Sequence, residues 1–343
     1  MLQLVTDDGR RSTTTNLDDA TSEAIVEVLS LPFRHVTIEL TGEVLEARVT
    51  KKGGLVSSRT PIPQRPVVLT HDRPKRHPIS EDAPFLETLR LASGGHVKPS
   101  RQAKFRQINE FIRILEGAAA WTRLRERERV QVVDLGCGNG YLTFAVHHYL
   151  SAAGRTCDVI GVDRDAGLIE RNRQRAVDGL RFEVGDISSF IPDDGPDIVM
   201  ALHACDTATD DALAAAVRWK SDLALVAPCC HHHVQAQADR SVLEPAEGLM
   251  LRHRILKERT GDVVTDTARA TLMRLAGYDV DVVEFVAPED TPKNLLIRAS
   301  RESLPVPQHL VVAYDAFTTR WAVRPYLEDL LRSEHVFGTV ERG

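Results

Sequence analysis

The stretch that decides the fold runs from Val130 to Tyr141 and reads VQVVDLGCGNGY. An apolar segment rich in β-branched residues leads into Asp134, and a helix-like run, Leu142 to Leu150, follows the stretch directly. Between them, glycines stand at alternate positions: Gly136, Gly138 and Gly140. This pattern predicts a buried parallel strand, a glycine turn and the N-terminus of a helix.

A glycine turn at the start of a helix is suited to binding an anion or a nucleotide. Glycine lets the backbone come close to a ligand, and the helix end offers unpaired N–H donors. The spacing is G-x-G-x-G, which differs from the G-x-G-x-x-G of dinucleotide-binding proteins. Asp134, two residues before the first glycine, suits a ligand that carries an ammonium group. An ordinary strand–helix turn is the alternative interpretation.

Two more acidic residues stand at or just past the ends of predicted strands. The second strand, Val159 to Val162, runs into Asp163, and the third, Leu180 to Val184, is followed by Gly185, Asp186 and Ile187. We expect Asp163 to accept hydrogen bonds from ribose hydroxyls and Asp186 from an adenine amino group, with Ile187 packed on the ring. Each carboxylate alone could be a helix cap. Together they point to a ligand at the carboxyl edge of one sheet.

The remaining pattern completes an α/β fold. Four more strands are predicted, at 197–202, 223–227, 280–285 and 295–297. Helices are predicted at 100–116, 166–176, 210–219 and 264–276. The alternation predicts a Rossmann-like sheet of seven strands that ends in an antiparallel hairpin.

Composition and charge narrow the setting of the protein. The 343 residues are 43% apolar and carry a net charge of −6. Without a long apolar run or the apolar core of a signal peptide, we expect no membrane contact and a cytoplasmic location. The five cysteines do not form a disulfide pattern, so reduced thiols are the simpler interpretation. The oligomeric state stays open.

The first part of the chain predicts a small α+β domain of residues 1–78. Its expected elements are a loose start over 1–15, a helix from Leu17 to Leu31 capped by Asn16, and a hairpin of 35–40 and 44–49. Basic residues gather in its second half: Arg48, Lys51, Lys52, Arg59, Arg65, Arg73, Lys75 and Arg76. A basic region on an acidic protein favours RNA as a partner, and a merely solvated surface is the alternative.

Four motifs around the glycine turn carry a family resemblance. They are KFRQINEF (104–111), LHACDTATD (202–210), PCCHH (228–232) and TPKNLLIRA (291–299). The chain resembles bacterial class I S-adenosylmethionine (SAM) methyltransferases with the LHACDTATD and PCC signatures. They are similar to proteins of the METTL25 type and, more distantly, to tRNA 2′-O-methyltransferases of the Trm13 type, whose zinc-finger motifs are not apparent here.

The resemblance implies SAM as the methyl donor and divides the chain further. It implies a helical linker over the cofactor cleft at 79–129, a SAM-binding domain at 130–303 and a C-terminal helical extension at 304–343. The cofactor-binding residues are then the glycine turn and its neighbours: Asp134, Gly136, Gly138, Gly140, Tyr141, Asp163, Asp186 and Ile187. RNA, either rRNA or tRNA, is the first expectation for the acceptor. The alternatives are a small molecule or a protein, or a SAM-binding module without catalysis.

We expect the acceptor group between 202–206 and 227–232, at the ends of the fourth and fifth strands. An in-line methyl transfer draws much of its rate from positioning. Asp206 is the first choice for a proton acceptor, His231 is the second, and His203 is a third candidate. The residues expected to hold the substrate are Lys104, Cys229, Lys293 and Asn294.

The cysteine and histidine cluster at these strand ends allows three interpretations. Cys229, Cys230 and His231 to His233, with His203 and Cys205 one strand away, could hold zinc, but the spacing is not the usual C-x₂-C. Cys229 could be a nucleophile of lowered pKa. The third interpretation is that the thiols pack as small apolar groups. We predict no metal site from the sequence.

Overall fold

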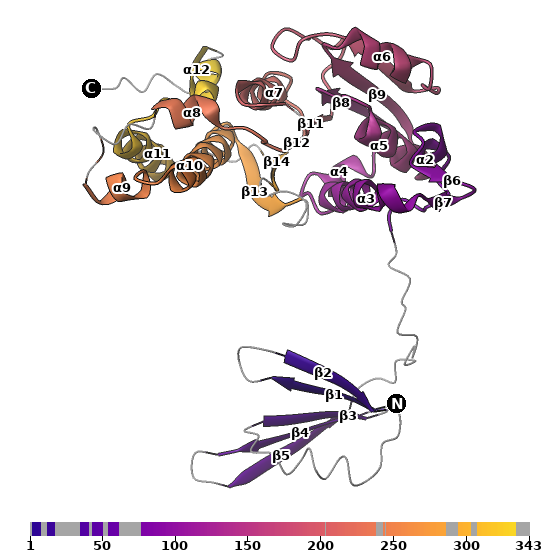
Figure 1. The fold of residues 1–343 in the computed structure, drawn as a ribbon, viewed down its shortest axis with the longest axis vertical. Coiled ribbons are helices and arrows are strands. Elements are labelled where there is room, and N and C mark those ends of the chain that lie inside the picture. The colour runs from indigo at the N-terminus through magenta and orange to yellow at the C-terminus, as the bar shows by residue number, and fades with distance from the viewer. Residues whose placement is uncertain are drawn as a thin grey trace. The chain divides into compact units, whose positions relative to one another are not determined.

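The computed structural model describes residues 2–7, 12–17, 35–40, 43–50, 54–61, 77–202, 204–237, 243, 245–285, 294–302 and 307–333. The chain divides into two compact units, Met1–Lys75 and Arg76–Gly343 (Figure 1). Each unit is described by itself.

The larger unit is built on a seven-stranded sheet with the order β10-β9-β8-β11-β12-β14-β13. The strands are β8 (Arg129–Leu135), β9 (Thr156–Asp163), β10 (Leu180–Val184), β11 (Ile198–Ala201), β12 (Leu223–Val226), β13 (Tyr278–Glu284) and β14 (Leu295–Arg301). All neighbours are parallel except β14, which is antiparallel to both β12 and β13. The predicted Rossmann-like sheet with an antiparallel last hairpin is confirmed.

Helices cover both faces of this sheet (Figure 1). One core joins the sheet to the helices α2 (Pro84–Thr88), α3 (Gln102–Glu116), α4 (Trp121–Leu124), α5 (Tyr141–Ala152) and α6 (Ala166–Arg173). The other joins it to α7 (Thr207–Arg218), α10 (Arg254–Leu275), α11 (Gln308–Trp321) and α12 (Tyr326–Ser333). Because both faces are covered, every residue of β11 and β12 is buried, which explains their unbroken apolar sequences.

Short elements complete the unit. A 3₁₀ turn, η1 (Pro99–Arg101), leads into α3, and β6 (Ala92–Ser93) pairs with β7 (His96–Val97). The helices α8 (His232–Gln237) and α9 (Pro245–Met250) contact α10. Sequence periodicity placed the start of α10 ten residues too late, because its first turns are largely exposed and lack an apolar stripe. Among the described residues, no helix is long and apolar enough to cross a membrane.

The direction in which successive strands are added to the sheet reverses at β8, although the strands there are parallel. From β8 the chain steps outward to β9 and β10, then returns to β11 on the other side of β8 and steps outward again to β12. The loops that leave the carboxyl ends of β8 and β11 therefore run in opposite directions along the sheet edge. Such a switch point is where open α/β sheets bind ligands.

The smaller unit contains two antiparallel sheets among its described residues. β1 (Leu2–Asp7) pairs with β2 (Ser12–Leu17), and β3 (His35–Leu40), β4 (Glu43–Val49) and β5 (Leu55–Pro61) form a three-stranded sheet. The predicted loose start at 1–15 is therefore wrong, since the threonine run of β2 favours a strand.

The helix predicted from Leu17 to Leu31 is wrong at its start. Leu17 pairs with Leu2, and Asn16, its expected cap, pairs with Gln3. The cap signal was local, whereas the pairing with β1 is a contact over a longer stretch of chain. The rest of this predicted helix lies outside the described residues.

Candidate functional site

A cavity of about 670 Å³ lies at the switch point of the sheet. It is lined by the loops after β8, β9, β10 and β11, the first turns of α5 and α7, and one side chain from α3. Cavities of this size suit a ligand of drug or cofactor dimensions. The predicted cofactor residues that line it are Asp134, Gly136, Gly138, Tyr141, Asp163, Asp186 and Ile187.

The glycine turn approaches the cavity through its backbone. Gly138 has a φ of +53°, and a Cβ placed there would meet no atom within 4 Å, because that space belongs to the cavity. The N–H of Gly138 donates to Asp163 Oδ2 at 2.8 Å, and its carbonyl accepts from Asn172 Nδ2 at 2.9 Å. Gly140 does not line the cavity and serves the turn, since a Cβ there would lie 3.2 Å from Phe144. The turn is thus held from both sides while its surface stays open.

Asp134 is a buried carboxylate at the edge of the cavity. Its side chain is 3% exposed, and its Oδ2 accepts a hydrogen bond from Thr143 Oγ1 at 2.6 Å. Burial raises the pKa of Asp134 to about 7, the Thr143 hydroxyl opposes this rise and the charge of Asp163 adds to it. Among the described residues, no positively charged side chain lowers the pKa of Asp134. A ligand ammonium group fits that position.

The other two acidic residues are more exposed. Asp163 accepts from Gly138 N and, through Oδ1, from Asp165 N at 2.9 Å, so it holds the turn and also faces the cavity. Asp186 accepts two bonds from Ser188 at Oδ1, and these bonds lower its pKa. Both carboxylates keep acceptor capacity for hydroxyl or amino groups of a ligand.

A lysine from α3 reaches over the same cavity. Lys104 Nζ donates to Gln107 Oε1 at 2.6 Å and lies 5.4 Å from the centre of the Tyr141 ring. Burial, with a smaller contribution from Arg101, lowers the pKa of Lys104. This cation on the cavity wall suits an anionic part of a ligand, either the carboxylate of a cofactor or a group of the acceptor.

Three thiols from the loops after β11 and β12 meet beside the cavity. Cys205 is exposed and lines the cavity, and its Sγ lies 3.0 Å from Cys229 Sγ. Cys230 completes a group whose sulfur atoms all lie within 4.8 Å of one another. The pKa of Cys229 is raised by burial and by Cys205, which does not support a nucleophile of lowered pKa.

Asp206 follows Cys205 with a backbone conformation that side chains rarely adopt, φ +53° and ψ −119°. Its Oδ1 accepts from His233 N at 3.1 Å, in the first turn of α8, and its carbonyl accepts from Arg269 Nη2 at 2.9 Å. The carboxylate therefore caps α8, not the helix that follows it. Asp206 does not line the cavity, and its predicted catalytic role stays a prediction.

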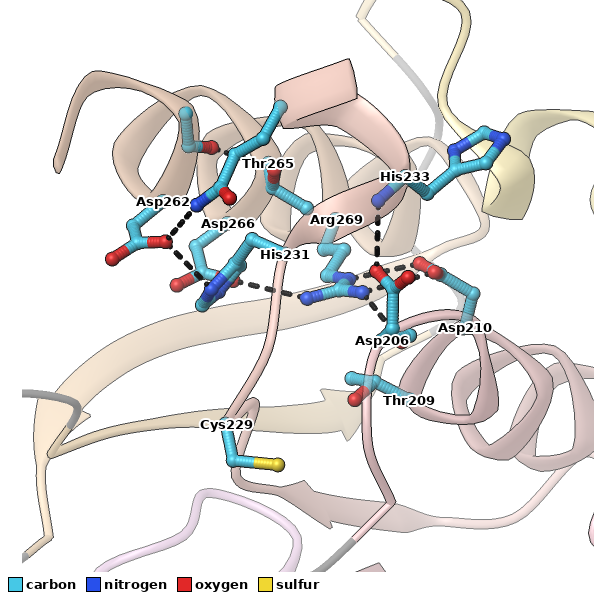
Figure 2. A network of polar contacts seen from close by, with 12 residues as sticks. Asp206, Thr209, Asp210, Cys229, His231, His233, Asp262, Thr265, Asp266 and Arg269 are labelled. Carbon is cyan, nitrogen blue, oxygen red and sulfur yellow. Dashed lines mark hydrogen bonds and ion pairs between the residues drawn. The ribbon is translucent and has the colours of Figure 1, made fainter. Parts of the chain in front are cut away.

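His231 lies inside the protein, between two carboxylates of α10 (Figure 2). It is 2% exposed, with Nδ1 2.9 Å from Asp262 Oδ1 and Nε2 2.9 Å from Asp266 Oδ1. Burial lowers its pKa, but the two carboxylates outweigh burial and raise it overall. With both ring nitrogens engaged, the imidazole is not placed to take a proton from an acceptor in the cavity.

A buried arginine joins His231 to the end of β11. Arg269 is 1% exposed, donates to both carboxylate oxygens of Asp210 at 2.8 and 2.9 Å, and contacts Asp266 at 3.3 Å. This cluster, together with Asp206, ties α7, α8 and α10 to one another. In Figure 2 the Cys229 side chain points away from it. The segment after β12 thus sends Cys229 toward Cys205 and His231 toward α10.

The remaining predicted site residues fall outside the cavity or outside the description. His203 and Lys293 lie outside the described residues. Asn294 is half-buried directly before β14, and its main-chain carbonyl accepts a hydrogen bond from Phe285 N at 2.7 Å. Neither Cys229 nor Asn294 lines the cavity.

Sequence reasoning missed part of the cavity wall. The lining residues outside the predicted cofactor set and the predicted acceptor segment 202–206 are Cys137, Asn139, Leu142, Arg164, Gly185, Thr207 and Ala208. Most of them directly flank a predicted residue, so their position beside the motifs was an available signal. The partners Asp210, Asp262, Asp266 and Arg269 had no such signal, because they meet only through helix packing.

Comparison with known protein families finds a match at this site. Residues 103–237 match the model of a methyltransferase domain, a range that covers the glycine turn and both thiol-bearing loops. A trans-aconitate 2-methyltransferase of Methylobacterium nodulans is 38% identical over 72 residues, which is 21% of this chain and 26% of that protein. The match thus spans about a quarter of this relative's length.

Solved structures with a similar fold are also methyltransferases. The methyltransferase domain of the citrinin polyketide synthase is 16% identical, with a TM-score of 0.37, over 61% of this chain and 58% of that one. A magnesium protoporphyrin IX methyltransferase from Synechocystis, with bound S-adenosylhomocysteine (SAH), is 17% identical, with a TM-score of 0.35, over 64% and 94%. The plantazolicin methyltransferase with SAH gives 12% and 0.37, over 60% and 91%.

The sheet has the strand order of a Rossmann-like fold, and residues 103–237 match a methyltransferase domain. The cavity at the switch point has groups that fit SAM: a buried carboxylate for the ammonium group, an open glycine turn and two further acceptors.

Proposed function

We propose that the protein transfers the methyl group of SAM to an acceptor that enters beside the loops after β11 and β12. The observation that carries this proposal is the continuity of one cavity. Its walls include the loops after β8, β9 and β10, with Asp134, Asp163 and Asp186, and the loop after β11, with Cys205 and Thr207. A cofactor held by the first three loops would leave the β11 side for the acceptor.

Residues around the cavity divide the work of binding. Asp134 would hold the ammonium group, Asp163 the ribose, and Asp186 the adenine amino group. SAM supplies an electrophilic methyl group when bound. The protein contributes the position of the acceptor, since in-line approach within about 3 Å accounts for much of the rate in such a transfer.

Among the described residues, the acceptor side offers few groups that can move a proton. Asp206 caps α8 and His231 is held between two carboxylates. We therefore infer that catalysis rests mainly on positioning, with Asp206 as a support of the β11 loop. An acceptor that is already nucleophilic, or that loses its proton to solvent, suits such a site.

RNA remains the acceptor that we propose first, supported by the basic stretch at 44–80. Of its basic residues the structure describes Arg48 and Arg59. Arg48 lies opposite Val56, and Arg59 lies opposite Leu45, so the two arginines are on opposite faces of the three-stranded sheet. An RNA contact would thus need basic residues outside the described ones, with Lys51 and Lys52 first. The resemblance to METTL25-type proteins belongs to this proposal as well.

One experiment tests both the activity and the acceptor. RNA from cells with and without the protein is digested and its nucleosides are compared by mass, and purified protein is then assayed on the RNA that lacks the methyl group. A methylated nucleoside that depends on the protein supports the proposal. SAM binding with no methylated nucleoside would move the acceptor to a small molecule or protein.

Salt dependence tests the basic stretch separately. Each lost phosphate contact lowers the slope of log affinity against log salt by roughly 0.7–0.9. Replacing Lys51 and Lys52 by alanine should flatten this slope and leave SAM binding unchanged. The control removes two exposed basic residues of the larger unit, Arg252 and Arg254, and should leave the slope as it is.

A small-molecule acceptor is the second candidate, and one observation favours it. The relative with 38% identity over 72 residues is named for trans-aconitate, a small anion. Lys104 on the cavity wall could pair with an anionic acceptor. A role without catalysis is distinguished by the absence of SAH release with every acceptor tested.

A further inference from the structure

Three cysteine sulfurs from two separate loops gather beside the cavity. Cys205 comes from the loop after β11, whereas Cys229 and Cys230 come from the loop after β12. All three sulfurs lie within 4.8 Å of one another, and none of the three cysteines forms a disulfide. Within the part of the chain that the structure describes, these three side chains are close enough to hold one metal ion.

The spacing of these sulfurs suits a tetrahedral metal ion. With Zn–S bonds of about 2.3 Å, the sulfurs of a tetrahedral site are about 3.8 Å apart. Cys205 and Cys229 at 3.0 Å are closer than this, and the widest pair is at most 4.8 Å apart, so small side-chain rotations reach the required geometry. A set of thiolates selects soft or borderline cations such as Zn²⁺.

The neighbours of the thiols give this arrangement a fixed frame. Asp206, next to Cys205, is held by bonds to His233 and Arg269, and Arg269 is buried among its partners. These bonds fix the β11 loop against α8, which begins two residues after Cys230. The two loops that bring the thiols together are therefore braced to each other by contacts that do not involve the thiols.

We propose that Cys205, Cys229 and Cys230 form a thiolate site for Zn²⁺, with a fourth position open toward the cofactor cavity. Binding releases the thiol protons to solvent as the three Zn–S bonds form. Three protein ligands and one open position are typical of zinc sites that act on a substrate, whereas structural sites are closed by four. Because Cys205 lines the cavity, the open position faces the acceptor end.

Such a site names a class of acceptor. Zinc in an open site binds a sulfur, nitrogen or oxygen donor and lowers its pKa, so the acceptor is nucleophilic without a protein base. This accounts for an acceptor side on which Asp206 and His231, two predicted proton acceptors that the structure describes, are engaged by other groups of the protein. The role as acceptor anchor rests on the proposed function, but zinc binding itself does not.

The experiment measures metal and leaves methyl transfer aside. Untagged full-length protein is reduced, reconstituted with Zn²⁺, desalted and analysed for zinc per chain, and Co²⁺ is then titrated in its place to detect sulfur-to-cobalt charge transfer. We expect about one zinc per chain and thiolate ligation. Cys205→Ser, Cys229→Ser and Cys230→Ser should each weaken Co²⁺ binding by at least about tenfold, the cost of disturbing even outer contacts of a metal site.

Matched controls keep the result interpretable. Cys157→Ser removes a buried thiol that bonds Ser151 on the α5–β9 side and should leave zinc content unchanged. His232→Ala and His233→Ala remove neighbouring imidazoles and should also leave it unchanged. SAM affinity reports folding, and it should stay near that of the wild type in Cys229→Ser and Cys230→Ser.

Each contrary outcome overturns a stated part. If the fully reduced protein takes up no zinc, the site is overturned. Loss of zinc in the histidine variants moves it away from the thiols. Loss of zinc in His203→Ala shows a closed four-ligand site and overturns the open position. Zinc bound without any effect on methyl transfer leaves the site standing and removes its role toward the acceptor.

Discussion

The two halves of the sheet edge use acidic residues in different ways. On the β8–β10 half, Asp134, Asp163 and Asp186 all line the cavity. On the β11–β12 half, Asp206 caps α8 and Asp210 is buried against Arg269. Carboxylates at one edge of one sheet thus divide into those that face a ligand and those that hold helices in place.

The physical difference lies in what surrounds each carboxylate. Asp134 accepts a hydrogen bond from a hydroxyl, and its pKa is raised. A cationic group of a ligand would therefore stabilise its ionised form. Asp210 has an arginine that donates to both of its oxygens. A charge that the protein has already paired cannot hold a ligand, and one that it has left unpaired is suited to do so. The predictions below test this contrast.

The largest effect is expected from a change on the β11–β12 half, called the paired half because Arg269 is paired there with Asp210. Arg269→Ala leaves Asp210 and Asp266 buried without their counter-charge, and we expect a loss of roughly 3–5 kcal/mol in the free energy of unfolding. Arg254→Ala is the control on the same helix, because its partner Glu258 is at 3.4 Å and Arg254 is 94% exposed. It should cost about 0–1 kcal/mol. Urea unfolding measures both, and similar losses in the two variants would refute the contrast.

On the cofactor half, a change should act on binding far more than on folding. Gly138→Val places a side chain in the cavity at a φ of +53°, and SAM affinity should fall by about 100-fold or more, roughly 3 kcal/mol. Gly154→Val is matched to it, with a φ of +76° and nothing within 4 Å of the added Cβ, but it does not line the cavity. Both variants should lose similar stability, about 1–2 kcal/mol. Calorimetric titration would contradict the assignment if both bound SAM alike.

The predicted cofactor residues, apart from Gly140, line one cavity, and their sequence signals are local. A β-branched run, a glycine turn and an acid at each strand end lie within a few residues of one another, and the alternation of strands fixes which edge they share. The paired half depends on Arg269 and Asp266, some sixty residues away from Asp206 and Asp210. Patterns in a single sequence do not pair such distant positions, so both Asp206 and Asp163 were expected to face a ligand. β2 was missed for the same reason, since its pairing with β1 outweighed a cap signal at Asn16.

A smaller effect on binding is expected from the ribose acceptor. Asp163→Ala removes a charged acceptor, which is worth about 1.5–3 kcal/mol of SAM affinity. Part of this loss passes through the turn, because Asp163 also accepts from Gly138 N. Asp165→Ala is the control in the same loop: it removes the cap bond from Leu168 N and should cost about 1 kcal/mol of stability with SAM affinity retained. Equal SAM affinity in Asp163→Ala and the wild type would remove this residue from the cofactor site.

The pH dependence of SAM binding should report the unpaired charge of Asp134. Its pKa of about 7 means that ligand ammonium binds only after a proton leaves, so affinity should fall by up to about tenfold per pH unit below 7. The stability of the free protein should run the other way. The unfolded carboxyl ionises near pH 4, so this group makes the fold less stable as the pH rises from about 4 to 7.

Two controls separate Asp134 from other groups in that profile. Methylthioadenosine lacks the amino-acid end, and its affinity should not follow this titration. Thr143→Val removes the hydroxyl that opposes the shift, so the midpoint should move to higher pH. A SAM profile that is flat from pH 5 to 7.5 would show that Asp134 does not meet the ammonium group.

The smallest effect is expected where the charge of the paired half is removed but its hydrogen bond is kept. Asp206→Asn retains an oxygen for His233 N, and asparagine caps helices about as well as aspartate. We therefore expect a single-turnover methylation rate within about threefold of the wild type, whereas loss of a general base costs about 10²-fold or more. Asp206→Ala is the companion variant, because it removes the bond as well and should lower stability by about 1 kcal/mol. If Asp206→Asn lost about 10²-fold in rate with SAM affinity and stability retained, the Asp206 carboxylate would act on the acceptor. Asp206 would then belong with the carboxylates that face a ligand, and Asp210 would remain among those that hold helices in place.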